Sequence, residues 1–225
     1  MDTQLDHCEF CDEFSGGTHN SFAERFHEDR MDRTVIETES LRVVPTLGQI
    51  AQGYLLIVPR HHCCAIADLP AEFLREVEQP KTRLAGSLRD TYGQYVFFEH
   101  GVRTQGSGGC GISHAHLHAI PVGTEQDPIE KLKAAFPHKR VPSLSRLGDI
   151  LRDVSYLYYE DTRGECHVFY PQFLPSQYMR RILAEALGVQ QWDWRTSGRE
   201  ESVLVTKANV SVALRDVPAV SECVK

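Results

Sequence analysis

Three histidines alternate with apolar residues near the middle of the chain: His114, His116 and His118. On a β-strand, residues two apart point to the same face, so the three imidazoles would stand in a row about 7 Å apart, with the apolar residues between them packed in the core. A single histidine in a strand is most often satisfied or exposed. Three in strict alternation predict a site at which imidazole does chemistry.

Two kinds of chemistry use such a row: binding of a catalytic metal by all three imidazoles, or nucleophilic and acid–base work by one or two of them. The loop before the histidines, residues 106–111, is rich in glycine. Glycine lets the backbone approach a ligand closely, and its N–H groups can form an anion-binding concavity. A phosphate beside a neutral imidazole, with the ring nitrogen attacking phosphorus, is therefore the favoured interpretation.

The elements that must position these histidines are short strands and one long helix. Residues 34–47 predict a hairpin, 54–58 an interior strand and 94–99 a further strand. An acidic residue ahead of Pro70 predicts a helix start, and Pro80 should kink or divide that helix.

Polarity rises after Pro121, which predicts a boundary there. Beyond it we expect a hairpin over 156–170 and a helix over 178–187 that ends at Gly188. The residues after Trp194 are expected to be partly loose.

The stretch 114–120, HAHLHAI, resembles the histidine triad pattern, His-φ-His-φ-His-φ-φ with φ apolar, at every position. The segment 53–62, GYLLIVPRHH, is similar to the Gly-strand-Pro-basic-x-His segment of that family. The resemblance covers roughly residues 8–121. It implies an α+β fold with an antiparallel sheet of about five strands, a long helix between the third and fourth, and usually a homodimer. We therefore expect a catalytic core over 1–124 and an α+β carboxy-terminal extension over 125–225 that contributes to the substrate pocket or the dimer interface.

The resemblance also implies an activity. His116 would be the nucleophile, His118 would contact the phosphate oxygens, and His114 would orient the site. Family members cleave a P–O or P–N bond at a nucleotide α-phosphate through a nucleotidyl-histidine, without a catalytic metal or an organic cofactor. We expect a nucleotidyl hydrolase or transferase. A dinucleotide phosphorylase or sugar-phosphate nucleotidylyltransferase is one alternative, and a nucleotide-binding module with little catalysis is another.

A second group of residues could hold zinc. Cys8 and Cys11 have the spacing of half a tetrahedral zinc site, although two free thiols remain the alternative. With His62 and His114 they resemble the structural zinc site of cysteine-bearing histidine triad proteins. His61 competes with His62 as the third ligand, and His62 aligns with the family histidine. Cys63 and Cys64 are better interpreted as ordinary core residues.

The chain departs from the family pattern at the positions that bind the substrate in family members. The family's Asn-x-Gly and Gly-Gln pairs correspond here to Glu99-His100-Gly101 and to Gly109-Cys110-Gly111, and Thr46 lies where an acidic residue usually holds the ribose. We take Glu99, Thr46, Gly109, Cys110 and Gly111 as the substrate-binding candidates. Glu99 is either a contact to the substrate or a strand-end carboxylate in solvent, and His100 either a further base or a surface histidine.

The carboxy-terminal region contains two further candidates. Arg180 and Arg181 could bring cations to the pocket, but a packed helix with a solvated arginine pair is the preferred interpretation. Trp192 and Trp194 could stack a base, but are more typical of a cap on a small core.

Composition limits the partners. The 225 residues include 24 Lys and Arg against 31 Asp and Glu, a formal net charge of −7. This balance argues against a nucleic-acid polymer or an anionic membrane surface and leaves a nucleotide or nucleotide conjugate as the expected partner. Residues 1–14 lack the features of a secretory signal, and no run approaches the ~18 apolar residues of a membrane helix. Seven cysteines, an odd number, predict a reduced, cytoplasmic setting rather than a disulfide framework.

Overall fold

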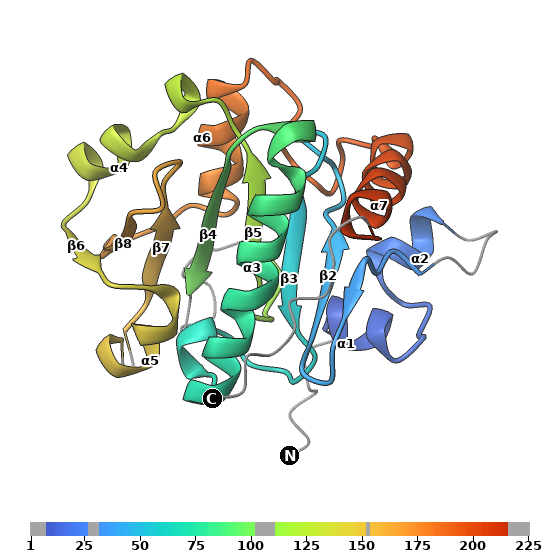
Figure 1. Ribbon diagram of the computed structural model, residues 1–225, viewed down its shortest axis with the longest axis horizontal. Helices are drawn as coiled ribbons and strands as arrows, with labels where there is room; N and C mark the ends of the chain where they lie inside the picture. Colours follow the sequence, from blue (N-terminus) through green and yellow to red (C-terminus); the bar gives the residue numbers. More distant parts are fainter. Residues whose placement is uncertain (1–7, 27–31, 102–110, 152–153, 216–225) are drawn as a thin grey trace.

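The computed structural model describes residues 8–26, 32–101, 111–151 and 154–215. They form one antiparallel sheet with helices on both faces (Figure 1). The strands are β1 Ile36–Glu37, β2 Leu41–Pro45, β3 Leu55–Pro59, β4 Tyr95–Gly101, β5 Leu117–Pro121, β6 His138–Val141, β7 Tyr156–Glu160 and β8 Cys166–Phe169. The α-helices are α1 Glu9–Phe14, α2 Ser21–Arg25, α3 Ala71–Tyr92, α4 Ile129–Ala135, α5 Leu147–Ile150, α6 Tyr178–Ala186 and α7 Glu200–Arg215. The short 3-10 helices are η1 Ile66–Asp68, η2 Thr124–Gln126 and η3 Leu144–Arg146.

The eight strands run in the order β1-β2-β3-β5-β4-β7-β8-β6. Residues 1–124 contribute β1 to β5, with α3 between β3 and β4, which agrees with the predicted α+β class and its five-stranded core. The sheet is larger than that core because β7 pairs antiparallel with β4 and carries β8 and β6 with it. Strands on both sides of the expected boundary near residue 124 therefore share one sheet, and the division into two domains stays a prediction.

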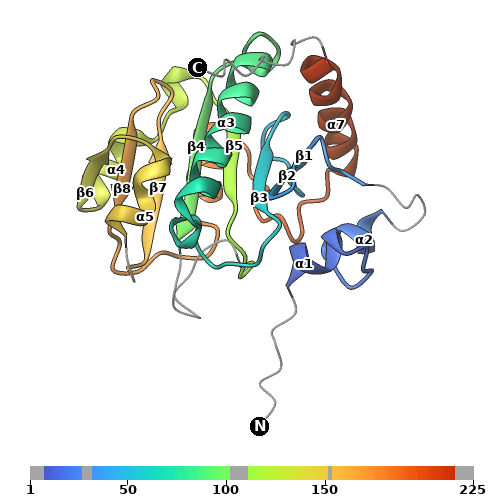
Figure 2. The same cartoon turned by 60° about the horizontal axis from the view of Figure 1, so that its bottom comes forward.

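Two apolar layers cover the two faces of the sheet. Side chains of α3, α5 and α7 pack on one face, and those of α1, α4 and α6 pack on the other. Figure 2 shows α3 lying along the central strands, and α7 packs against α3 and β2. Since both faces are covered, β3 is buried at every position and reads as a continuous apolar run. His118 on β5 has the same parity as Ile120 and points to the α1, α4 and α6 face.

Two expectations about helices need correction. Pro80 does not divide the predicted helix, because α3 continues through it from Ala71 to Tyr92. The residues after Trp194 are not loose as far as they are described, because α7 packs against α3 and β2. Its buried residues Val203, Val210 and Leu214 recur at helical spacing, which buries one face of the helix. None of the helices in the described ranges is long and apolar enough to cross a membrane.

Candidate active site and metal centre

The three histidines do not all lie on a strand. β5 begins at Leu117, and pairing with β3 starts at the same residue, opposite Ile57, so His114 and His116 come before the ladder. The chain turns away there because Ala115 donates its N–H to the Cys63 carbonyl at 2.7 Å. His116 and His118 still meet, with ring centroids 4.7 Å apart, while His114 is directed elsewhere.

His116 is buried and neutral. Its Nδ1 lies 2.6 Å from the carbonyl oxygen of His114, and because a carbonyl can only accept, Nδ1 carries the proton. Burial lowers the pKa of His116 to about 4, and the Arg180 cation acts in the same direction, against the opposing hydrogen bond to the His114 carbonyl. At neutral pH the ring therefore holds its lone pair on Nε2, which is the form that a nucleophilic imidazole requires.

His118 is fixed on two sides. Its Nδ1 forms a 2.7 Å hydrogen bond with the Tyr54 hydroxyl, and its ring stacks on Phe98 at a centroid distance of 4.2 Å. Burial, with charge repulsion from His116 and His100, holds the pKa of His118 well below its usual range. A second neutral imidazole thus lies beside the first.

A small cavity adjoins these two rings. Its volume is about 30 Å³, which is room for a water molecule or two, so a nucleotide would require the lining side chains to move apart. The side chains around it come from both halves of the chain and include His116, His118, Thr46, Phe22, Arg180 and Trp194.

Arg180 lines this cavity, which is the alternative that the sequence analysis named but did not prefer. It is 1% exposed, donates Nε–H to the Trp192 carbonyl at 3.1 Å and a terminal N–H to the Gly48 carbonyl, and lies over the Tyr54 ring. Within the described residues no carboxylate forms an ion pair with it. The prediction that both arginines are solvated is therefore wrong for Arg180 and confirmed for its exposed neighbour Arg181. The available signal was spacing, because Arg180 shares a helix face with the buried Leu183.

Glu99 does not reach the histidines. It has the opposite parity to Phe98 on β4 and points to the α3 face, where its carboxylate accepts the Ile66 N–H and the Tyr156 hydroxyl, each at 2.6 Å. Neither a substrate contact nor a solvated strand end fits this position. Its carboxylate instead satisfies the start of η1, which has no other side-chain cap.

Of the other substrate-binding candidates, some are placed by the structure and some lie outside the described residues. Thr46 lines the cavity. Gly111 lies at φ +79°, where glycine is favoured, and a Cβ there would collide with the Arg195 guanidinium. Gly109 and Cys110 fall outside the described residues.

His100 is buried rather than on the surface. Its Nε2 accepts the N–H of Met179 at the start of α6, and its ring centroid lies 6.1 Å from that of His118. Burial, followed by repulsion from His116, lowers the pKa of His100 to about 3. A third neutral imidazole, on β4, therefore lies between the start of α6, which it contacts, and the ring of His118.

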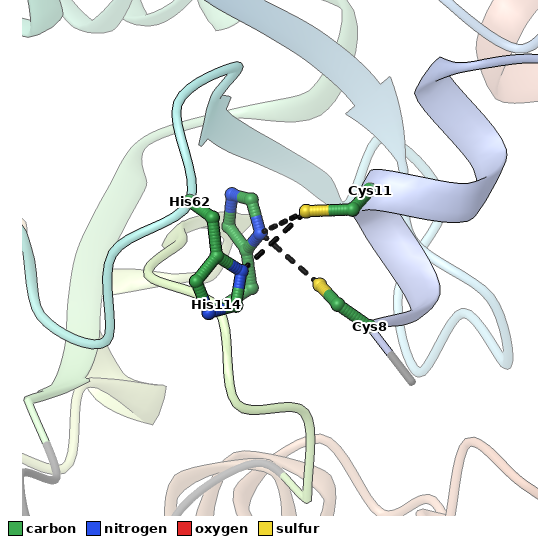
Figure 3. Close-up of side chains that lie close together, drawn as sticks. All are labelled: Cys8, Cys11, His62 and His114. Atoms are coloured by element: carbon green, nitrogen blue, oxygen red, sulfur yellow. Dashed lines mark hydrogen bonds between the residues drawn. The ribbon is translucent and has the colours of Figure 1, made fainter. Parts of the chain in front are cut away.

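The four residues expected to hold zinc converge (Figure 3). Cys8 and Cys11 lie at α1, His62 follows β3 and His114 precedes β5, yet their ligand atoms all lie within 4.8 Å of one another. His114 Nδ1 is 3.3 Å from Cys8 Sγ and 3.6 Å from Cys11 Sγ, and His62 Nδ1 is 3.4 Å from Cys11 Sγ. The cluster contains His62 and not His61.

The tautomer of His114 suits a metal. Its Nε2 donates to the Pro59 carbonyl at 2.8 Å, so in the neutral ring Nδ1 carries a lone pair that faces the two sulfurs. Burial lowers the pKa of His114 to about 4, which keeps the ring neutral. A second nitrogen held by a backbone carbonyl is the usual way in which a protein orients a metal-binding histidine.

Comparison with known proteins gives several matches, although no family model matches the chain. CWF19-like protein 1 of Mus musculus is 28% identical over 178 residues, covering 71% of this chain and 32% of that protein. Adenosine 5'-monophosphoramidase HNT1 of Saccharomyces cerevisiae is 30% identical over 93 residues, covering 41% of this chain and 55% of that protein. The chain thus spans about a third and about half of these relatives.

Two solved structures are also similar. One is a hypothetical histidine triad nucleotide-binding protein from Sulfolobus tokodaii, 15% identical, covering 91% of this chain and 97% of that one with a TM-score of 0.39. The other is a zinc-bound histidine triad family protein from Mycobacterium smegmatis, 20% identical, covering 58% and 88% with a TM-score of 0.34. The resemblance to histidine triad proteins that the motifs predict is thus also found in the comparison with solved structures.

Proposed function

We propose that this chain is a histidine triad enzyme that cleaves a P–O or P–N bond at a nucleotide α-phosphate, with His116 as the nucleophile. The observation that carries the proposal is the state of His116: neutral, with Nδ1 committed to a backbone carbonyl and Nε2 left with its lone pair. It lies in ring contact with His118 at a cavity that Arg180 also lines.

Arg180 supports an anionic substrate. Within the described residues this guanidinium is buried without a carboxylate at ion-pair distance, which costs several kcal/mol of desolvation, and the more distant charge of Asp193 offsets only part of that cost. A phosphate at the cavity would supply that charge. The cation would then also stabilise the negative charge on the non-bridging oxygens in the transition state.

The proposed reaction has two steps. His116 Nε2 forms a bond to the α-phosphorus as the bond to the leaving oxygen or nitrogen breaks, and the electron pair departs with the leaving group, which takes up a proton. Water then attacks the nucleotidyl-histidine and loses a proton, and His116 leaves as the neutral imidazole. Tyr54 and Phe98 hold His118 in place throughout, so that its ring can contact the phosphate oxygens without reorganising.

Zinc bound by Cys8, Cys11, His62 and His114 would be structural. Four protein ligands close the coordination sphere, so the ion would tie α1 to the segment that carries His116 and would take no part in the chemical steps. Phe10 of α1 packs edge-on against the rings of His114 and His116, so fixing α1 also fixes one wall of the site.

A substrate panel tests the proposal. Dinucleoside polyphosphates and a nucleoside phosphoramidate should release a nucleoside monophosphate in the wild type and in His138→Gly, which removes an exposed histidine on β6, but not in His116→Gly. Added inorganic phosphate separates the alternatives, because only a phosphorylase would form a nucleoside diphosphate. Nucleotide binding without turnover of any member of the panel would favour the binding-module alternative. The homodimer and the cytoplasmic location stay predictions.

A further inference from the structure

His167 on β8 is buried and unpaired. It is 4% exposed, and neither of its ring nitrogens has a hydrogen-bond partner within the described residues. Buried polar atoms in native proteins are almost always paired, so two such atoms on one ring indicate a missing partner such as water or an ion. The active-site mechanism above makes no use of this residue.

Two carboxylates share the face of the hairpin on which His167 lies. Glu165 is two residues before His167, and Asp161 is two residues beyond Tyr159, the cross-strand partner of His167. One ligand atom from each of Asp161, Glu165 and His167 lies within 4.8 Å of the others. His167 Nε2 and Glu165 Oε2 are 3.9 Å apart, too far for a hydrogen bond. Two ligands bound at about 2.1 Å to a tetrahedral ion lie roughly 3.4 Å apart, so a small side-chain shift would close this gap.

The cations around the cluster are already paired with carboxylates. Arg140 of β6 forms a 3.0 Å ion pair with Glu165, so an ion bound there would compete with this exposed arginine. Lys133 is paired with Glu130 at 3.0 Å, which offsets part of its charge.

The geometry points to a second metal site, in which Asp161, Glu165 and His167 bind a divalent transition-metal cation such as Zn²⁺. One nitrogen and two carboxylate oxygens are ligands that zinc accepts, and three protein ligands leave a position for water. Two interactions of Asp161 compete with the ion: its carboxylate also caps the turn at residues 161–165 and pairs with Arg163 at 2.9 Å. Arg163 is 61% exposed and can turn to solvent at little cost.

This site differs from the cysteine cluster in its donors and in its place. It lies on the β7–β8 hairpin, in the part of the sheet built by the carboxy-terminal region, where β6 and not β8 is the edge strand (Figure 1). The thiol of the intervening Cys166 contacts Tyr158 and Glu160 and is not among the clustered ligand atoms. A Co²⁺ ion at the hairpin would therefore show d–d absorption without a thiolate charge-transfer band, whereas Co²⁺ at the cysteines would show both.

Metal counting on the full chain tests the inference. After chelation and titration with Zn²⁺ or Co²⁺, the wild type should bind two equivalents and His167→Phe one, with the thiolate band of that remaining equivalent unchanged. Phenylalanine fills the same aromatic space and removes both unpaired nitrogens, so His167→Phe should fold. Glu165→Gln should weaken the second equivalent at least tenfold, and Glu185→Gln, an exposed carboxylate on α6, should leave both equivalents intact. One equivalent in the wild type, or a second equivalent that survives His167→Phe, would overturn the assignment.

Discussion

Replacement of Arg180 by methionine separates a role in catalysis from a role in the fold. Methionine keeps an unbranched apolar stem and removes the guanidinium. The carbonyls of Gly48 and Trp192 each lose a donor, at about 1–3 kcal/mol apiece. Removing a buried cation that has no ion pair gives back several kcal/mol of desolvation. The two effects oppose each other, so we expect the free energy of unfolding to change by no more than about 2 kcal/mol. Loss of one preorganised charge at the phosphoryl group should lower kcat by about 10²–10³-fold.

The assay is steady-state turnover of the best substrate of the panel, with kcat and KM measured separately and the melting temperature as a check on folding. Arg181→Met is the matched control, because that neighbouring arginine is exposed and should leave both constants unchanged. Arg180→Lys keeps the charge without the planar fork and should fall between the wild type and Arg180→Met. A folded Arg180→Met enzyme with kcat/KM within about threefold of the wild type would refute this reasoning.

Three further predictions concern the residues around the histidines. Cys8→Ser should abolish the thiolate band of bound Co²⁺ and, if the ion contributes about 2 kcal/mol, lower the melting temperature by roughly 4–8 °C; an unchanged metal spectrum would contradict the site. Tyr54→Phe breaks the hydrogen bond to His118 and should lower kcat about tenfold with KM nearly constant, whereas a change in KM alone would argue against a positioning role. His100 has its pKa lowered to about 3 in the folded chain against 6.5 in the unfolded chain, so its contribution to stability is lost as pH falls from 6.5 to 3. Between pH 4 and 6 the free energy of unfolding should therefore change with pH less steeply in His100→Gln than in the wild type, by up to about 1.4 kcal/mol per pH unit. The same slope in both proteins would exclude His100 as the source.

Local patterns predicted the features that depend on local geometry. The spacing of Cys8 and Cys11 and the alternation of the histidines are short-range signals, and the structure brings His62 and His114 to the same cysteines. The five core strands were predictable for the same reason, since apolar runs and turn residues mark them directly.

The sequence analysis misplaced Glu99 and Arg180 because it could not assign them to one face of the sheet or the other. Glu99 lies on a strand that is buried on both sides, so the apolar pattern of β4 does not distinguish the histidine face from the α3 face. Arg180 reaches the cavity only because α6 lies on the α1 side of the sheet. Arg180 and His116 line the same cavity although they are more than 60 residues apart in the sequence. The helix α7 carried a readable signal in the spacing of its buried residues, which the polar composition of the tail obscured.

The central claim is that His116 forms a covalent bond to the nucleotide. Rapid acid-free quenching of the enzyme with a substrate labelled at the α-phosphate, followed by mass spectrometry of the peptides, tests it most directly. We expect a nucleotidyl adduct on His116 in the wild type and none in His116→Gly. An adduct on His118 or His100, or steady turnover by the folded His116→Gly variant, would contradict it.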